Sequence, residues 1–240
     1  MKRDERSTSY RFNPLILLIL LIPCVEDTVL VDFHLYLITD RHATKRPLVE
    51  AVRLALEGGV RAVQLREKDL PIRELLAMAR DLRQLTREFN AKLFINERVD
   101  VAIVSEADGV HVGVNGIPVP AVRHIVGDRM LIGASTHNIE EAKAATDGGA
   151  NFITFGPLFE TPSKMKYGNP VGIKLLNCIA NLIAIPVFGL GGVKSGSIAQ
   201  IMAAGAHGIA CISAILSADD IKQAAERMVR ETADAGKGKT

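Results

Sequence analysis

The sequence contains little cysteine. Its 240 residues include three cysteines, at positions 24, 178 and 211, and none of them forms a Cys-x-x-Cys pair. So few and so widely spaced cysteines exclude a disulfide-stabilised fold and a structural zinc site. They are typical of a protein of the reducing cytosol, and we therefore predict a cytoplasmic location.

Net charge is also low, because 29 lysines and arginines face 27 aspartates and glutamates and leave a net charge of +2. This balance argues against a broad nucleic-acid-binding surface, so we expect no nucleic-acid partner. Any anionic ligand must instead be bound by a local group of cations. The 48% hydrophobic and 23% charged content excludes a disordered chain.

No hydrophobic run is long enough to cross a membrane. The apolar stretch Leu15–Cys24 has ten residues, whereas a spanning helix needs ~20, so we expect no membrane partner. Residues 1–30 differ in composition from the rest, and we interpret them as an N-terminal extension. Two origins stay open for it: a coding start assigned upstream of a true start near Val29–Val31, or a signal-like segment. The fold is expected to occupy residues 31–235.

Short apolar runs alternate with segments of helical periodicity along the body of the chain. Predicted strands lie at 35–39, 62–65, 92–95, 109–112, 130–134, 152–155, 186–190 and 208–212. Predicted helices lie at 48–57, 72–89, 139–146, 198–204 and 217–232. Continuously apolar strands are typical of parallel sheets buried on both faces. Eight alternations in about 200 residues predict an α/β fold, a single (β/α)8 TIM barrel. A doubly wound open sheet is the alternative.

Polar residues after the second run suit an anionic ligand. If the alternation of a strand continues, then Gln64, Arg66 and Lys68 project to one side. One amide and two cations match a phosphate or a pyrophosphate. The alternative is a loop whose charges face water.

The strands that follow end in further candidates. Asn96 follows the third run, and the segment 133–138 follows the fifth. Ser135 or Asn138 is suited to cap the next helix. His137 is suited to exchange protons near neutral pH. His111 lies inside an apolar run, and we interpret it as a packed structural residue.

The longest connection, residues 156–172, holds Thr161, Ser163 and Lys164, whose hydroxyls and ammonium suit a second anion. Gly191–Gly192 after the seventh run and the helix start at Ser213 suit a phosphate bound by backbone N–H groups. Loops after the seventh and eighth strands are the recurrent phosphate site of such barrels.

Several motifs resemble thiamine phosphate synthase and its relative thiazole tautomerase, in order, over residues 31–232. The motifs are LYLITDR, QLREKD, INERVDVA, DGVHVG, IGASTHNIEEA, FGPLFETPSK, GLGGV and CISAI. The resemblance implies a barrel enzyme that joins hydroxymethylpyrimidine pyrophosphate to thiazole phosphate and releases pyrophosphate. Its partners would be these two small phosphorylated substrates. A homo-oligomer is compatible with the sequence.

The resemblance also implies roles for individual residues. Arg66, Lys68, Lys164 and His137 would take part in catalysis. Residues implied to bind substrate are Gln64, Asn96, Ser135, Thr161, Ser163, Gly192, Ile212 and Ser213. Of these, Gln64, Asn96 and Ser135 would contact the pyrimidine substrate, and the remaining five would contact the thiazole phosphate.

The sequence departs from the synthase pattern at the two aspartates that bind Mg²⁺. Glu97 keeps one carboxylate on a longer side chain, and Gly116 offers no ligand. We therefore expect a weakened Mg²⁺ site at Glu97. This departure keeps two alternatives open: a thiazole tautomerase that uses His137 to move a proton, and a non-catalytic thiamine-phosphate-binding protein.

Overall fold

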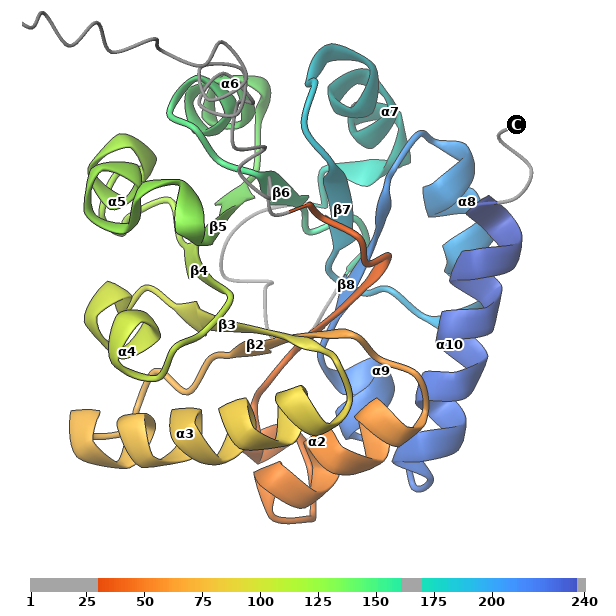
Figure 1. The fold of residues 1–240 in the computed structure, drawn as a ribbon. Helices are drawn as coiled ribbons and strands as arrows, with labels where there is room; N and C mark the ends of the chain where they lie inside the picture. Colours follow the sequence, from red (N-terminus) through yellow and green to blue (C-terminus); the bar gives the residue numbers. More distant parts are fainter. Residues whose placement is uncertain (1–29, 161–169, 237–240) are drawn as a thin grey trace, which may run out of the picture.

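The computed structural model describes residues 30–160 and 170–236, in which eight parallel strands close into a barrel (Figure 1). The strands are β1 (Leu35–Ile38), β2 (Ala62–Leu65), β3 (Lys92–Asn96), β4 (Gly109–Val112), β5 (Leu131–Thr136), β6 (Phe152–Phe155), β7 (Val187–Leu190) and β8 (Gly208–Cys211). Each pairs with the next, and β1 closes the sheet against β8 with Leu35 opposite Ile209. The predicted TIM barrel is confirmed, and the open sheet is wrong.

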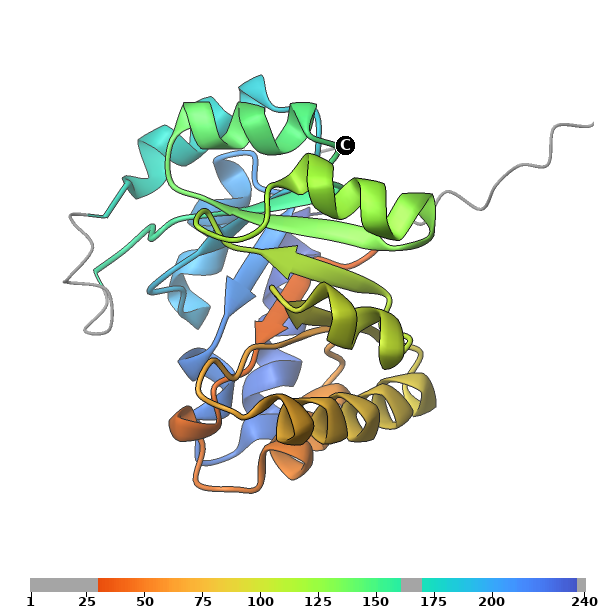
Figure 2. The same ribbon diagram turned by 90° about the vertical axis from the view of Figure 1, so that its left-hand side faces the viewer.

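Helices surround the barrel and connect successive strands (Figures 1 and 2). They are α2 (Leu48–Glu57), α3 (Ile72–Glu88), α4 (Val99–Val104), α5 (Val119–Val126), α6 (Ile139–Asp147), α7 (Gly172–Leu182), α8 (Ile198–Ala203), α9 (Ser213–Leu216) and α10 (Ile221–Gly236). Short 3-10 turns are η1 (Arg41–Ala43), η2 (Gly127–Arg129) and η4 (Ser195–Ser197). No helix within the described ranges is long and apolar enough to span a membrane.

The prediction of one helix over 217–232 is wrong at its start. Two helices follow β8, and α10 begins only at Ile221. The side chain of Asp220 accepts a hydrogen bond from the backbone N–H of Gln223 at 2.9 Å, so Asp220 precedes the first turn as its cap. Ser217 is held elsewhere, because its hydroxyl donates to the carbonyl of Ala43 at 2.7 Å.

Aromatic rings fill the barrel at the end where the strands begin. Phe33 is buried there, with its ring centroid 5.2–5.7 Å from the rings of Tyr36, Phe94, Phe152 and Phe188. The Phe94 and Phe152 rings meet Phe33 edge to face and the Phe188 ring stacks on it, and edge-to-face and offset-stacked pairs are the favoured aromatic geometries. This aromatic layer closes one end of the barrel and leaves the opposite end for polar groups.

Glycines on the strands make room for these rings. A Cβ atom on Gly109 would lie 2.5 Å from the ring of Phe94, and one on Gly208 would lie 2.7 Å from the ring of Phe188. Real Cβ atoms do not approach other atoms this closely. Part of the 20 glycines therefore serves the packing of large interior side chains.

Candidate active site

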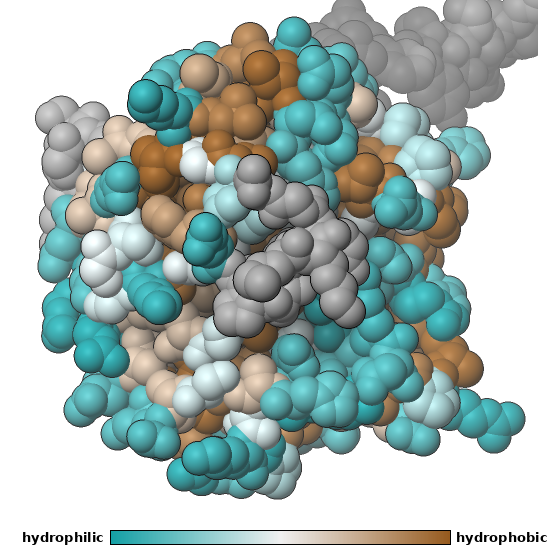
Figure 3. Space-filling view, turned by 180° about the vertical axis from the view of Figure 1, so that it is seen from behind, coloured by the Kyte–Doolittle hydropathy of each residue, from teal (hydrophilic) through white to brown (hydrophobic). Residues whose placement is uncertain are grey.

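The strand arrows in Figure 2 point toward one end of the barrel, and Figure 3 views the molecule from that end, where hydrophilic side chains form much of the rim. In a parallel barrel this mouth is the place where ligands bind. The predicted residues on β2, β3 and β5 lie at this end because each belongs to the last residues of its strand. Gln64 is 1% exposed inside the barrel, and Asn96 is half-buried.

Strand β5 ends two residues later than the prediction, at Thr136, so Ser135 belongs to the strand. Its hydroxyl oxygen lies 3.1 Å from Nε2 of His111 on β4. The capping role belongs to Asn138, whose side chain accepts the backbone N–H of Glu141 at 2.8 Å. Ser135 is thus free to face the mouth and is not used to cap helix α6.

His111 connects two sides of the barrel. Its Nδ1 lies 3.4 Å from the hydroxyl of Tyr36, which accepts a 3.0 Å hydrogen bond from Nε2 of Gln64. Burial and, to a smaller extent, the charge of Arg66 lower the pKa of His111 to about 3. The imidazole is therefore neutral near pH 7 and acts as a hydrogen-bonding group.

Arg41 forms ion pairs with the acidic residues that follow β2. The guanidinium of Arg41 lies 3.3 Å from the buried carboxylate of Glu67 and makes a bidentate pair with Asp69 at 2.5 and 2.6 Å. In the part of the chain that the structure describes, no carboxylate pairs with Arg66 or Lys68. Two cations therefore remain for an anionic ligand.

The two cations differ in position. The backbone N–H of Arg66 donates to the hydroxyl of Thr39 at 2.9 Å, and its side chain is half-buried near His111. Lys68 is exposed. Strand β2 ends at Leu65, so the strict alternation on which the prediction relied does not continue to Lys68.

Glu97 follows β3 with a φ of +59°, which bulky residues rarely adopt. Its carboxylate covers the turn after β4, where a Cβ atom on Gly113 would lie 2.7 Å from Oε1. A Cβ atom on Gly116 would lie 3.7 Å from Cγ of Glu97. Across residues 30–160 and 170–236, no group of three or more His, Cys, Asp or Glu side chains is placed to hold a metal ion.

The donor set at Glu97 is thus one carboxylate beside a turn without a second acidic side chain. Mg²⁺ is commonly bound by one or two carboxylates together with substrate phosphates and water. One carboxylate at the mouth fits this mode, provided that the substrate supplies phosphate oxygens.

His137 lies at the start of the connection to α6. Both its backbone N–H and its Nδ1 approach Oε2 of Glu141, at 2.7 and 3.0 Å. The side chain is 43% exposed. Glu141 of α6 therefore holds the imidazole of His137 at the rim, apart from the buried hydrogen bonds of His111.

The glycine pair after β7 has the conformation that glycine favours. Gly191 and Gly192 have φ values of +93° and +68°, and a Cβ atom on Gly192 would lie 2.7 Å from Cβ of Phe159. Ile212 and Ser213 start helix α9 after β8. Thr161, Ser163 and Lys164 lie outside the described residues.

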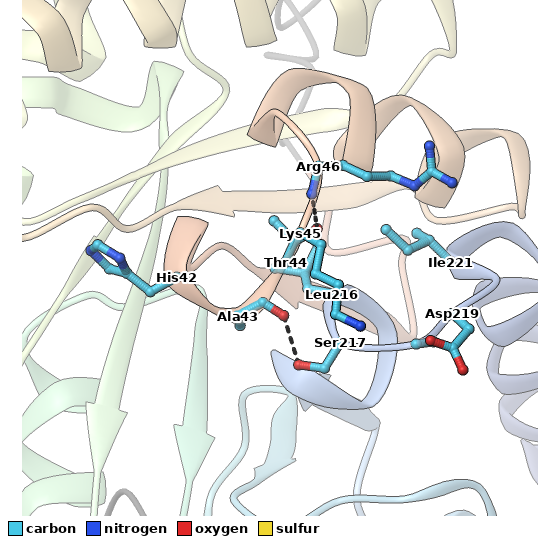
Figure 4. Close-up of a pocket in the computed structure, with 10 residues that line it drawn as sticks. His42, Ala43, Thr44, Lys45, Arg46, Leu216, Ser217, Asp219 and Ile221 are labelled. Carbon is cyan, nitrogen blue, oxygen red and sulfur yellow. Dashed lines mark hydrogen bonds between the residues drawn. The ribbon is translucent and has the colours of Figure 1, made fainter.

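A cavity of about 400 Å³ lies beside the mouth, between the connection after β1 and the one after β8 (Figure 4). Its lining includes Lys45, Arg46, Ser217 and Asp219. Figure 4 shows His42 directed away from it. None of the predicted site residues lines this cavity, so we place the candidate active site at the barrel mouth.

Four contributors to the mouth were not assigned to the site from sequence: Tyr36, Arg41, Glu67 and His111. A signal existed for Tyr36, because a hydroxyl in a buried strand needs a hydrogen-bonding partner. The other contacts join residues 24 to 75 positions apart, which local patterns do not reveal.

Comparison with known proteins identifies the family. The sequence model described as thiamine monophosphate synthase matches residues 35–215. The chain belongs to the thiamine monophosphate synthase family. The family resemblance predicted from the motifs is confirmed, together with the function of a thiamine-phosphate synthase, a transferase of thiamine biosynthesis.

Relatives of this family cover most of the chain. A protein of Geobacter sulfurreducens is 53% identical over 200 residues, which are 83% of this chain and 94% of that protein. The thiamine-phosphate synthase of Roseiflexus sp. (strain RS-1) is 44% identical over 186 residues, 77% of this chain and 79% of that enzyme. The structure of thiamine phosphate pyrophosphorylase from Pyrococcus furiosus has a TM-score of 0.78 at 38% identity, over 84% of this chain and 96% of that one.

Proposed function

We propose that the mouth of this barrel joins hydroxymethylpyrimidine pyrophosphate to thiazole phosphate. The observation that carries the proposal is the pairing of Arg41 with both Glu67 and Asp69, which leaves Arg66 and Lys68 for the pyrophosphate. Arginine and lysine beside a partly buried surface bind phosphate oxygens strongly. Lys164 would add a third cation to this site.

The reaction needs charge stabilisation and positioning. The bond between the pyrimidine methylene carbon and the pyrophosphate oxygen breaks, and its electron pair leaves with pyrophosphate. The lone pair of the thiazole nitrogen then forms the new carbon–nitrogen bond, so that no proton is gained or lost. Arg66, Lys68 and Lys164 stabilise the charge that develops on the leaving group. Gln64, Asn96 and Ser135 orient the pyrimidine.

The thiazole phosphate is assigned to the opposite side of the mouth. Gly192, Ile212 and Ser213 offer backbone N–H groups after β7 and β8, and Thr161 and Ser163 would add hydroxyls. Glu97 would hold Mg²⁺ together with the pyrophosphate. When bound there, Mg²⁺ supplies positive charge that neutralises the phosphate oxygens.

The proposal is tested by incubating the purified chain with both substrates and Mg²⁺ and measuring thiamine phosphate. We expect Arg66→Ala and Lys164→Ala to lower kcat/KM by at least about 100-fold, the effect of losing a charged transition-state contact. Arg53→Ala is the matched control, because it removes a cation paired with Glu88 on the outer helices. Equal activity of Arg66→Ala and Arg53→Ala would contradict the site.

The tautomerase alternative has one observation in its favour, the anchoring of His137 Nδ1 by Glu141 at the rim. Such anchoring orients an imidazole for proton transfer. The same preparation incubated with thiazole carboxylate phosphate separates the two activities. Isomerisation that is lost in His137→Ala, without coupling in the wild type, would replace the synthase proposal.

A further inference from the structure

A chain of buried hydrogen bonds crosses the barrel below the mouth. Gln64 on β2 donates through Nε2 to the hydroxyl of Tyr36 on β1 at 3.0 Å, and that hydroxyl lies 3.4 Å from Nδ1 of His111 on β4. Nε2 of His111 lies 3.1 Å from the hydroxyl of Ser135 on β5. Gln64, Tyr36 and His111 are each no more than 2% exposed. Two residues assigned to the pyrimidine are thus linked through two residues with no assigned role.

The chemistry of these groups fixes the direction of the chain. The amide nitrogen of Gln64 only donates, so the Tyr36 oxygen accepts, and its own proton is directed to Nδ1 of His111. A neutral imidazole that accepts at Nδ1 carries its proton on Nε2, which donates to Ser135. The carbonyl oxygen of Gln64 and the hydroxyl proton of Ser135 then remain available for a ligand.

The packing around His111 holds its ring in this position. A Cβ atom on Gly133 would lie 2.5 Å from Nδ1, so only glycine leaves room for the imidazole on that side. The hydroxyl of Thr154 lies 3.4 Å from Nε2 on the other side. The ring of Phe152 packs against both His111 and Tyr36, with centroid separations of 5.8 and 5.4 Å. An imidazole enclosed in this way keeps one orientation.

We propose that Tyr36 and His111 are positioning residues that set the hydrogen-bonding polarity of the pyrimidine site. Through them, Gln64 presents an acceptor and Ser135 presents a donor. This inference rests on the proposed function. The pyrimidine ring of hydroxymethylpyrimidine pyrophosphate carries an amino group. Such an aminopyrimidine offers an exocyclic N–H group as donor and a ring-nitrogen lone pair as acceptor, and is complementary to the Gln64 acceptor and the Ser135 donor. The analogue with oxygen in place of the amino group reverses this polarity and is rejected.

Steady-state kinetics with the aminopyrimidine pyrophosphate and its oxo analogue test the specificity. Tyr36→Phe keeps the aromatic ring and removes the hydroxyl that links Gln64 to His111, which interrupts the chain of hydrogen bonds. We expect its KM for the amino substrate to rise about tenfold, the effect of one buried hydrogen bond, with the KM for thiazole phosphate unchanged. The preference for amino over oxo substrate should fall by the same factor.

Two further variants separate positioning from packing. In His111→Gln the amide nitrogen replaces the Nε2 donor toward Ser135, so the preference for amino over oxo substrate should stay within about threefold of wild type. His111→Leu removes this donor and should lose the preference. Thr232→Val is the matched control, because it also removes a buried hydroxyl, one that donates to the carbonyl of Met228 in α10. Its preference should equal that of wild type.

NMR of the full-length wild type with ¹⁵N-labelled histidine shows which ring nitrogen of His111 carries the proton. We expect the His111 proton on Nε2 in wild type, and a proton on Nδ1 would overturn the inference. An unchanged preference in Tyr36→Phe would overturn it as well. A wild type that forms no thiamine phosphate contradicts the proposed function, whereas an active wild type whose preference survives in Tyr36→Phe contradicts only this inference.

Discussion

Replacing Phe33 by alanine should destabilise the protein strongly and leave the mouth of the barrel intact. Phe33 is 3% exposed and lies against four aromatic rings at the end opposite the mouth. Loss of a buried phenylalanine costs ~3–5 kcal/mol of unfolding free energy, because the transfer free energy is lost and a cavity remains. We expect ~4 kcal/mol, which lowers Tm by roughly 8–16 °C for a chain of this size.

The cavity provides a second measurement. Its walls would be the rings of Tyr36, Phe94, Phe152 and Phe188, and apolar cavities of this kind bind benzene. Benzene should therefore raise the Tm of Phe33→Ala and leave the Tm of wild type unchanged, because a ligand that binds only the native state stabilises it. Differential scanning calorimetry with and without benzene measures both effects.

The control is Phe89→Ala, because Phe89 is only half-buried at the end of α3. Phe89→Ala should lower the unfolding free energy by ~1–2 kcal/mol, because folding buries less of the apolar surface of Phe89 than of Phe33. Similar losses in the two variants would refute the reasoning about the aromatic layer. So would a change in KM of folded Phe33→Ala at 20 °C, because the layer would then also shape the mouth.

Three further predictions concern the mouth. Arg41→Met releases the carboxylates of Glu67 and Asp69, and steady-state kinetics should show a KM for the pyrimidine pyrophosphate raised about tenfold or more through repulsion of the substrate. Gly116→Asp adds a carboxylate near Glu97 and should lower the Mg²⁺ concentration for half-maximal coupling; no change in a Mg²⁺ titration would mean that the metal lies elsewhere. Arg41 and His42 hold the pKa of Asp69 well below its usual value. The unfolded chain therefore takes up a proton below pH ~4 while the native state does not, so stability falls with falling pH there, and Asp69→Asn should flatten this acid dependence in urea unfolding.

The strands were predictable because each is short, apolar and buried on both sides. The predicted runs at 62–65, 109–112 and 152–155 match β2, β4 and β6. Helices were harder, since α4 has only six residues and α5 starts between two prolines, Pro118 and Pro120. A six-residue helix shows less than two turns of periodicity, which is too little to distinguish from a loop.

The position of the site followed from topology, whereas the direction of its side chains did not. Strand ends predict that residues such as Gln64 and Asn96 meet at one mouth. Lys68 is exposed because β2 stops before it. His111 was interpreted as structural from its apolar run, but it bridges β1 and β5 through partners 75 and 24 positions away. Hydrogen bonds of this range depend on the register of the closed barrel.

The barrel interior therefore has two layers with separate consequences. Around Phe33, interior side chains are apolar, and changes there affect the free energy of unfolding. One step nearer the mouth, Gln64, Tyr36 and His111 form polar contacts that are fully buried. Breaking one of them leaves a buried donor or acceptor without its partner. Tyr36 belongs to both layers, since its ring packs on Phe33 and its hydroxyl joins the chain. Tyr36→Phe should therefore change substrate preference with little loss of packing, whereas Phe33→Ala should do the opposite.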